Sequence, residues 1–364
     1  MAICISHYAL QAPTGDLPAG LHRACQAGLT AYQAHRDHTA PDPISGAPTP
    51  LMLAQLPNDD DAPAFHPERL LPVLDQLIET NHDALQDSQL LLCLPATSRA
   101  RHALLERTLL PWLHKRLAQV GPLPDTDVTD PQHLPARLAS QIDRLMAGQI
   151  PSLTLIGLDS LLNEATLFER QPDNDLRTTT WAHGRVLSEA IALVRFQNGD
   201  DNTDGALSCT GLAHDRDNGE SRPLALARAT RRALYCDGSV PRPDRLVLTR
   251  AQRREDELHW YHTHTDLWPV RLSPRDNLAM RKGEKTAPQP DLPPPLHILR
   301  PALTLGDTGA ASLPLALITA CEALRFSLCP ARTALVLDSP GNGHQLAIHL
   351  QHTLNVSKEG TPHE

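Results

Sequence analysis

Short apolar runs alternate with longer amphipathic stretches along the first part of the chain. The short runs are rich in aliphatic residues and bounded by turn residues, which is typical of buried strands. The longer stretches carry apolar residues at helical spacing. The predicted strands are 2–6, 89–94 and 152–157, and the predicted helices are 17–29, 67–80, 99–120 and 134–148. This alternation predicts βαβ units and an α/β fold with a mostly parallel sheet.

The second part of the chain repeats the same alternation. Its predicted strands are 186–196, 206–212, 245–249, 333–338 and 346–350, and its predicted helices are 222–235 and 308–326. Three stretches, at 36–66, 121–132 and 282–294, are rich in proline and polar residues and lack periodicity. We therefore expect surface loops there.

Charge and composition exclude several classes of protein. The 33 Lys and Arg residues against 42 Asp and Glu give a formal net charge of −9, which argues against a nucleic-acid binder. No run of about 18 apolar residues occurs, so no membrane-spanning helix is predicted. The N-terminus lacks the basic and apolar regions of a signal peptide. The seven cysteines are odd in number and form no C-x-x-C pair, which favours reduced thiols in the cytoplasm.

Four segments carry a family resemblance. The sequence GDTGAAS at 306–312 resembles the G-H-x-x-G-A-A-G turn and helix of β-ketoacyl synthases, which belong to the thiolase-like superfamily. The segment at 147–160 is similar to that family's helix-to-strand passage, and 186–193 is similar to its G-E-G-A strand. The glycine-rich turn at 339–343 lies where the family has its terminal turn. All four occur in the family's order.

The resemblance implies a thiolase-like, five-layered αβαβα fold of two similar halves. The halves would comprise residues 1–217 and 218–355, followed by a flexible tail at 356–364. In the family, a strand that precedes the nucleophile helix mediates dimerisation. The corresponding stretch here, 122–131, is poor in strand-forming residues and interrupted by proline, so we expect that pairing to be shortened or replaced.

The chemistry of the family is not matched at the corresponding positions. Decarboxylative ketosynthases use a cysteine at a helix N-terminus and two histidines that stabilise an enolate. Carrying the family's spacing over places the nucleophile at Pro131 and the histidines at Ala251 and Asp307. An ionised aspartate cannot donate a hydrogen bond to an enolate, but it suits a helix N-terminus as a cap. We therefore predict a pseudoenzyme with no catalytic residue at these three positions.

A histidine cluster raises the question of a metal site. His259, His262 and His264 form an H-x-x-H-x-H pattern, but no cysteine and only loosely placed acids accompany them. A zinc site needs rigidly held ligands with second-shell partners. A polar surface helix or loop explains the pattern better, so no metal is predicted. No P-loop or dinucleotide fingerprint occurs either, and no cofactor is predicted.

Aromatic residues gather next to this cluster. Only 3% of the residues are aromatic, yet Trp260, Tyr261 and Trp268 lie within nine positions of one another. Exposed Trp and Tyr side chains are frequent interface anchors. A binding surface for a protein partner and a role in the core are both open for these residues.

Inactive ketosynthase-like chains suggest what such a scaffold does. In bacterial type VI secretion clusters, small thiolase-like proteins are thought to act as adaptors that load effectors. The segments LLLCLPATSRA at 90–100 and LGDTGAAS at 305–312 resemble that group. We therefore expect a non-catalytic adaptor that dimerises with itself or with a second thiolase-like chain and binds a secreted effector.

Two alternatives stay open. One is a chain-length-factor-like partner of an active β-ketoacyl synthase, which would shape that enzyme's acyl pocket. The other is an acyltransferase or hydrolase that uses an unrecognised residue such as His183 or Cys209.

Overall fold

The structure is a computed structural model of the chain. It describes residues 2–57, 70–95, 110–120, 125–170, 175–199, 207–219, 221–235, 239–250, 252, 254–268, 274–283, 296–326 and 331–352. The predicted tail at 356–364 and Ala251, the position that corresponds to the family's first histidine, lie outside these residues. Within the described part of the chain, none of the helices is long and apolar enough to cross a membrane.

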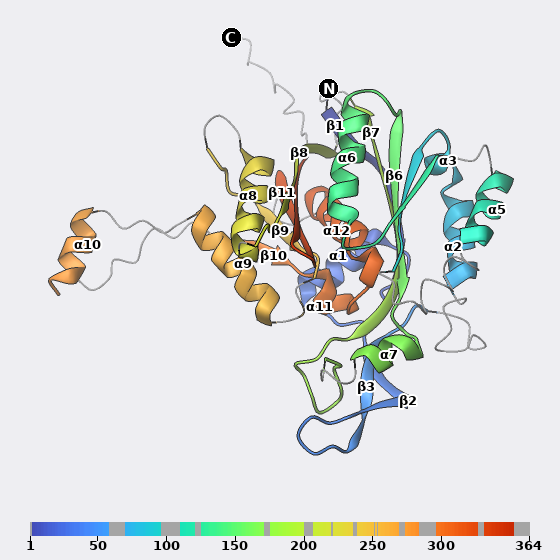
Figure 1. Ribbon diagram of the computed structural model, residues 1–364, viewed down its shortest axis with the longest axis horizontal. Helices are drawn as coiled ribbons and strands as arrows, with labels where there is room; N and C mark the ends of the chain where they lie inside the picture. The colour runs from blue at the N-terminus through green and yellow to red at the C-terminus, as the bar shows by residue number, and fades with distance from the viewer. Residues whose placement is uncertain are drawn as a thin grey trace, which may run out of the picture.

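The fold is a mixed α/β arrangement around one large sheet (Figure 1). The strands are β1 Ala2–Gln11, β2 Gln33–Pro41, β3 Pro48–Ala54, β4 Gln89–Cys93, β5 Thr126–Thr129, β6 Ser152–Ser160, β7 Leu187–Gly199, β8 Leu207–Arg216, β9 Arg245–Leu248, β10 His297–Leu299, β11 Thr333–Gly341 and β12 His344–His352. The helices are α1 Pro18–Ala27, α2 Leu70–Thr80, α3 His82–Leu85, α5 Leu110–Val120, α6 Leu134–Met146, α7 Glu164–Arg170, α8 Arg222–Leu234, α9 Arg254–Leu267, α10 Pro274–Arg281, α11 Pro301–Leu305, the short 3₁₀ turn η3 Gly309–Ala311 and α12 Ser312–Arg325.

The strand order shows that the two halves share one topology. The sheet runs β10-β9-β11-β12-β8-β1-β7-β6-β4-β5. Each half begins with its innermost strand, β1 or β8, and then forms a parallel trio, β5-β4-β6 or β10-β9-β11. A strand antiparallel to both the trio and the innermost strand, β7 or β12, completes each half. Short antiparallel pairing of β1 with β8 joins the halves.

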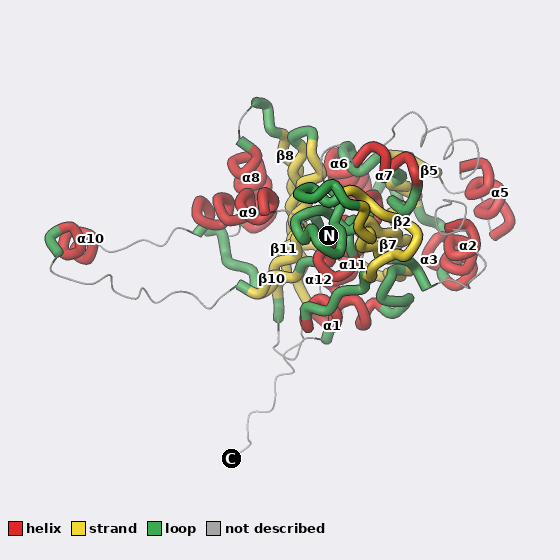
Figure 2. The backbone as a smooth tube through the Cα atoms, turned by 90° about the horizontal axis from the view of Figure 1, so that it is seen from below, coloured by secondary structure: helices red, strands yellow, loops and turns green. Residues whose placement is uncertain are grey.

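Figure 2 shows the helices arranged around the strands, and the layers follow from where apolar side chains are buried. Helix α12 is buried from Ser312 to Leu324 and packs against strands of both halves. A helix that is apolar on all sides is stable only inside a core. Helices α1 and α6 share this central core with α12. Helices α2, α3 and α5 cover the outer face of the first half, and α8 and α9 cover that of the second.

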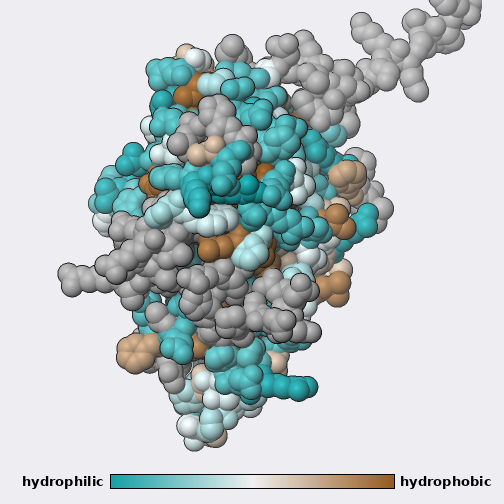
Figure 3. All heavy atoms as spheres, turned by 90° about the vertical axis from the view of Figure 1, so that its right-hand side faces the viewer, coloured by the Kyte–Doolittle hydropathy of each residue, from teal (hydrophilic) through white to brown (hydrophobic). Residues whose placement is uncertain are grey.

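These layers agree with the predicted αβαβα fold class. The outer face that carries α2 and α5 is mostly hydrophilic, with small separate apolar areas (Figure 3). Helix α10 stands apart from the layers (Figure 1). The predicted domain boundary near residue 218 stays a prediction, although the repeated strand pattern of the second half already begins with β8.

Three local predictions are wrong. The supposed loop 36–66 contains most of the β2–β3 hairpin, and the supposed loop 121–132 contains β5. Strand β2 is mostly exposed, so it lacks the alternation that reveals a half-buried strand. The sheet is mixed instead of mostly parallel, because β7, β12 and the β1–β8 junction all pair antiparallel.

Candidate functional site

The parallel strands of both halves lead into polar residues at their carboxyl ends. The triplet Leu-Asp-Ser closes β6 at Asp159 and recurs in β11 at Asp338. These two strands occupy the same place in the two topological repeats. In open α/β sheets, functional sites form beyond the carboxyl ends of parallel strands. The repeated triplet is therefore a sequence signal for this site.

Arg250 forms an ion pair beside the predicted position Ala251. Its Nε lies 3.0 Å from Oδ1 of the buried Asp338, which also accepts a hydrogen bond from the Thr249 hydroxyl. Burial lowers the pKa of Arg250, but the charges of Asp338 and Asp307 outweigh it and raise that pKa above its usual value. Arg250 also donates to the carbonyl of Gly309 at 3.4 Å. A guanidinium thus spans the end of β9 and the start of η3.

Asp307, the predicted position of the second histidine, lies in a web of charges. Its Oδ2 is 3.1 Å from Nη1 of Arg185 and 3.8 Å from Nη2 of Arg170. Asp175 bridges the same two arginines from the other side. Burial raises the pKa of Asp307, but these arginines and Arg250 lower it below its usual range. The carboxylate is therefore ionised at neutral pH.

The Asp307 carboxylate also binds the turn ahead of α12, although the N-cap residues of η3 and α12, Thr308 and Ala311, have no side-chain cap. Asp307 Oδ1 accepts a hydrogen bond from the N–H of Gly309 at 3.1 Å, at the start of the turn that leads into α12. Asp159 accepts the next N–H, from Ala310, at 3.0 Å. A Cβ on Gly309, whose φ is +53°, would lie 1.9 Å from Asp159 Oδ2. Glycine is needed there because the first half packs directly against this helix start.

Pro131, the predicted nucleophile position, is a buried turn residue ahead of α6. The preceding residue, Asp130, binds backbone N–H groups of the turn ahead of α6. Its Oδ1 accepts the N–H groups of Gln132 at 2.8 Å and His133 at 3.0 Å. These amides belong to the turn that precedes α6, whose N-cap residue is His133 and which has no side-chain cap. Sequence reasoning missed Asp130, although an aspartate just before a helix is a recognisable capping signal.

Cys93 beside the site is buried, whereas Cys209 on strand β8 is partly exposed. Cys93 ends β4, and burial raises its pKa well above the usual value. Arg250 opposes this effect, while Asp159, Asp338 and Asp130 add to it. Burial also raises the pKa of Cys209 to about 12. Because the thiolate is the nucleophile, both thiols are poor nucleophiles at neutral pH. His183, the other alternative, is exposed, with its ring edge-on to Trp181 at 5.2 Å.

The three aromatic candidates for a partner surface have different environments. Trp260 is 7% exposed and belongs to the core under α8 and α9. Trp268 is partly buried against the same core, and its Nε1 donates to the carbonyl of Val240 at 3.1 Å. Tyr261 is 62% exposed. Of the three, only Tyr261 presents a large free surface, because the two tryptophans fill the core of an aromatic-poor chain.

The three histidines of α9 lie in different environments. His259 lines a pocket, His264 packs edge-on to Trp260 at 5.6 Å, and His262 lies beside Tyr261. Burial, followed by the charge of Arg242, lowers the pKa of His264. Among the described residues, no group of three or more His, Cys, Asp or Glu side chains is arranged to hold a metal ion.

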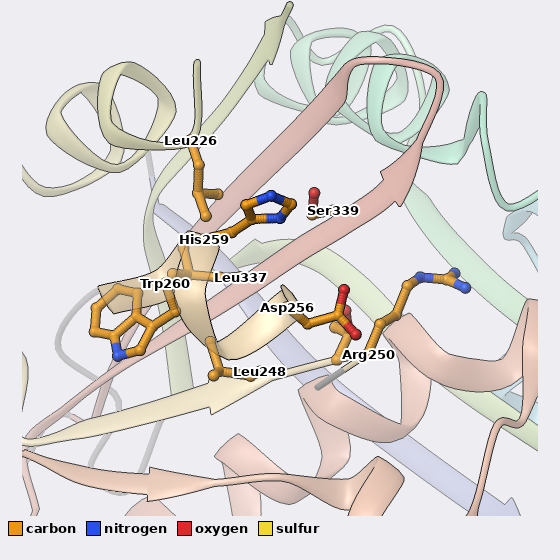
Figure 4. A pocket seen from close by; sticks show the side chains of 9 residues that line it. Leu226, Leu248, Arg250, Asp256, His259, Trp260, Leu337 and Ser339 are labelled. Atoms are coloured by element: carbon orange, nitrogen blue, oxygen red, sulfur yellow. The ribbon is translucent and has the colours of Figure 1, made fainter. Parts of the chain in front are cut away.

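The pocket lies between α8, α9, β9 and β11 (Figure 4). Its empty space is about 400 Å³ including the open solvent at its mouth. The lining residues are Leu226, Leu248, Thr249, Arg250, Asp256, His259, Trp260, Leu337 and Ser339. The imidazole of His259 lies beside Ser339, whereas Arg250 extends away from Trp260. The polar end of the pocket therefore borders the Arg250–Asp338 ion pair.

Comparison with known proteins identifies the fold. No protein-family profile and no curated protein matches the sequence. Among solved structures, an oxazolomycin ketosynthase domain from Streptomyces albus matches with a TM-score of 0.66 and 12% identity, over 97% of this chain and 75% of that one. The ishigamide ketosynthase/chain length factor matches with a TM-score of 0.62 and 15% identity, over 97% and 99%.

A third similar structure is a type II polyketide ketosynthase in complex with its acyl-carrier protein. It matches with a TM-score of 0.66 and 10% identity, over 97% of this chain and 99% of that one. The chain therefore has the thiolase-like fold of ketosynthases. At these identities, the similarity concerns the fold.

Proposed function

We propose that this chain is a non-catalytic, ketosynthase-like subunit that acts by binding another protein. One observation carries the proposal: charged side chains of the chain itself occupy the surroundings of the predicted catalytic positions. Arg250 pairs with Asp338, Arg185 pairs with Asp307, and Asp130 binds N–H groups of the turn just before α6.

The charges oppose ketosynthase chemistry. An enolate needs hydrogen-bond donors where its negative charge develops, whereas an ionised Asp307 repels that charge. A thiolate nucleophile needs a low pKa, whereas the Cys93 thiol has a raised one. The Arg250–Asp338 and Arg185–Asp307 ion pairs would also have to be broken before a substrate could bind to one of these charged side chains.

Edge strand β5 supports assembly with a second thiolase-like chain. It precedes α6, as the dimer strand of the family precedes the nucleophile helix, and it ends the sheet. Val128 on this strand is 43% exposed. An open edge with an exposed β-branched residue favours pairing with another strand. The partner is a second copy of this chain or a related chain.

The more specific role that we propose is that of an adaptor for loading a type VI secretion effector, in the cytoplasm. The segments 90–100 and 305–312, which resemble that group of proteins, support this role. A chain-length-factor-like role is the second candidate, because one similar structure is a ketosynthase/chain length factor. Both roles need a protein partner and neither needs a nucleophile.

Size-exclusion chromatography with light scattering tests the assembly. The chain is co-expressed with the products of neighbouring genes, including any secreted effector, and separately with an active ketosynthase. An adaptor co-elutes with the effector, and a chain-length-factor-like subunit co-elutes with the ketosynthase. A strict monomer that binds none of them refutes the proposal.

A matched pair of variants locates the interface. Val128→Glu places a charge on β5 and should abolish association, whereas Leu278→Glu on the distant helix α10 should leave it intact. Intact-mass measurement after exposure to acyl-CoA or acyl-carrier protein tests the rival enzymatic role. A covalent acyl adduct on Cys209, His183 or another residue would overturn the non-catalytic assignment.

A further inference from the structure

Three histidines from the two halves meet beside α6. His133 lies just before α6 in the first half, and His344 begins β12 in the second. Their ring centroids are 5.8 Å apart. His214 of β8 stacks on His344 at 5.1 Å, with an angle of 23° between the rings. We call these three residues the histidine stack.

The stack lies at a contact between two turns. The turn at 130–133 joins edge strand β5 to α6, and the turn at 341–343 joins β11 to β12. The side chains of Gln132 and Asn342 are also hydrogen-bonded across this contact. The two segments belong to different halves, so the contact links one half to the other.

The hydrogen bond inside the stack depends on protonation. Nε2 of His214 lies 2.8 Å from Nδ1 of His344. With one hydrogen between these nitrogens, one ring donates and the other accepts. One added proton leaves a charge-assisted N–H···N bond between a positive ring and a neutral one, whereas protonation of both rings sets two N–H groups and two positive charges against each other. Binding of a second proton therefore breaks this bond.

Neighbouring charges influence the stack from both sides. Asp130 lies 2.8 Å from Nδ1 of His133, and its charge raises the pKa of His344. Asp215 has the same effect on His214, but it is engaged by two arginines of α8. Arg216 of β8 opposes protonation of both His214 and His344, and Arg232 of α8 opposes that of His214.

The balance favours neutral rings. Burial, followed by the charge of His344, lowers the pKa of His214. Burial, followed by the charges of Arg216 and His133, lowers the pKa of His344, and Asp130 only partly offsets this. Both rings are therefore neutral at neutral pH, where the hydrogen bond between them is intact.

We propose that the His214–His344 pair is a pH-sensitive latch: it fixes the start of β12 and the β11–β12 turn, against which the turn 130–133 of the first half packs through His133. The unfolded chain binds protons at His214 and His344 from about pH 6.5 downward, whereas in the native pair both pKa values are lowered. Stability is therefore fully present above that value and is lost as the pH falls through the lower native values. The turn that is released, 130–133, directly follows edge strand β5.

Hydrogen exchange of the full-length chain tests the latch. Exchange is measured at about pH 7.5 and about pH 5.5, which bracket the usual histidine pKa, and is corrected for the intrinsic effect of pH. Peptides that span 126–140 should lose several-fold more protection at the lower pH than peptides of α12. Equal loss in both segments overturns the proposal.

A pair of variants separates the latch from general acid sensitivity. His214→Gln keeps a hydrogen-bonding side chain but does not titrate, and should remove most of the extra loss in 126–140. His262→Gln, on the exposed side of α9, should leave it unchanged. An undiminished loss in His214→Gln refutes the latch. If this variant fails to fold, NMR titration decides instead: His214 and His344 should titrate in two coupled steps below about pH 6.5, and independent titration at the usual pKa overturns the proposal.

Discussion

The Arg250–Asp338 ion pair allows a quantitative test of how the charged site is held together. Substituting Arg250→Met removes the guanidinium but keeps much of the apolar volume of the side chain. Asp338 then stays buried, and among the described residues the Thr249 hydroxyl is its remaining hydrogen-bond donor. Breaking a buried pair by removing one partner costs about 3–5 kcal/mol. Because Arg250 is 21% exposed, we expect the lower end of this range, about 3 kcal/mol.

The free energy of unfolding in urea, measured at neutral pH, provides the assay. A second substitution, Asp338→Asn, removes the uncompensated charge and leaves an acceptor for Thr249. The double variant should therefore recover about 2 kcal/mol of the loss. The control is Arg231→Met, which breaks the pair with Asp266, where both side chains are 43% exposed. Such a surface pair contributes about 0–1 kcal/mol.

The reasoning fails if Arg250→Met costs no more than Arg231→Met. It also fails if the double variant is as unstable as the single one, because the deficit would then come from lost packing and not from the buried charge. A change in the slope of the urea dependence would indicate that the denatured state has changed as well.

Two further predictions concern packing and reactivity. Gly309→Ala forces a Cβ against Asp159 at a positive φ, and should lower the free energy of unfolding in urea by about 3 kcal/mol. The control Gly283→Ala, at a similar φ but in open space, should lower it by about 1 kcal/mol. Equal losses would contradict the close approach of the first half to Gly309. Cys93 and Cys321, which are buried and have raised pKa values, about 12 for Cys321, should resist iodoacetamide in the native chain and react after denaturation. Mass mapping checks this, and rapid native labelling of either thiol would contradict their burial.

Much of the secondary structure could be predicted because its cause is local. The buried strands β4, β6 and β9 are short, uninterrupted aliphatic runs, and such runs are recognisable without knowledge of their partners. Helix α6 was predicted from its apolar periodicity. The β2–β3 hairpin was missed because its first strand is largely exposed, and an exposed strand has no hydrophobic pattern to reveal it.

The chemistry of the site could be predicted only in part. Asp307 was expected to cap a helix, and its carboxylate does accept the N–H of Gly309. Its arginine partners were missed, because Arg170 and Arg185 are distant in sequence and reach Asp307 from other elements. The roles of Trp260 and Trp268 stayed open in the sequence, because an apolar pattern alone does not tell a core aromatic residue from an exposed anchor. Their burial in the structure assigns both to the core.

By itself, the sequence determined most of the buried strands and helices, although not the β2–β3 hairpin or β5. It also determined the resemblance to ketosynthases and the residues at the positions of the family's catalytic groups. Only the tertiary structure decided which charges meet. Arg250 and Asp338 are 88 positions apart, and they pair because parallel β9 and β11 place Leu248 opposite Leu337. The histidine stack likewise forms only when turns of the two halves touch. Strand and helix preferences act over a few residues, whereas these electrostatic contacts depend on register and packing between segments that no local pattern connects.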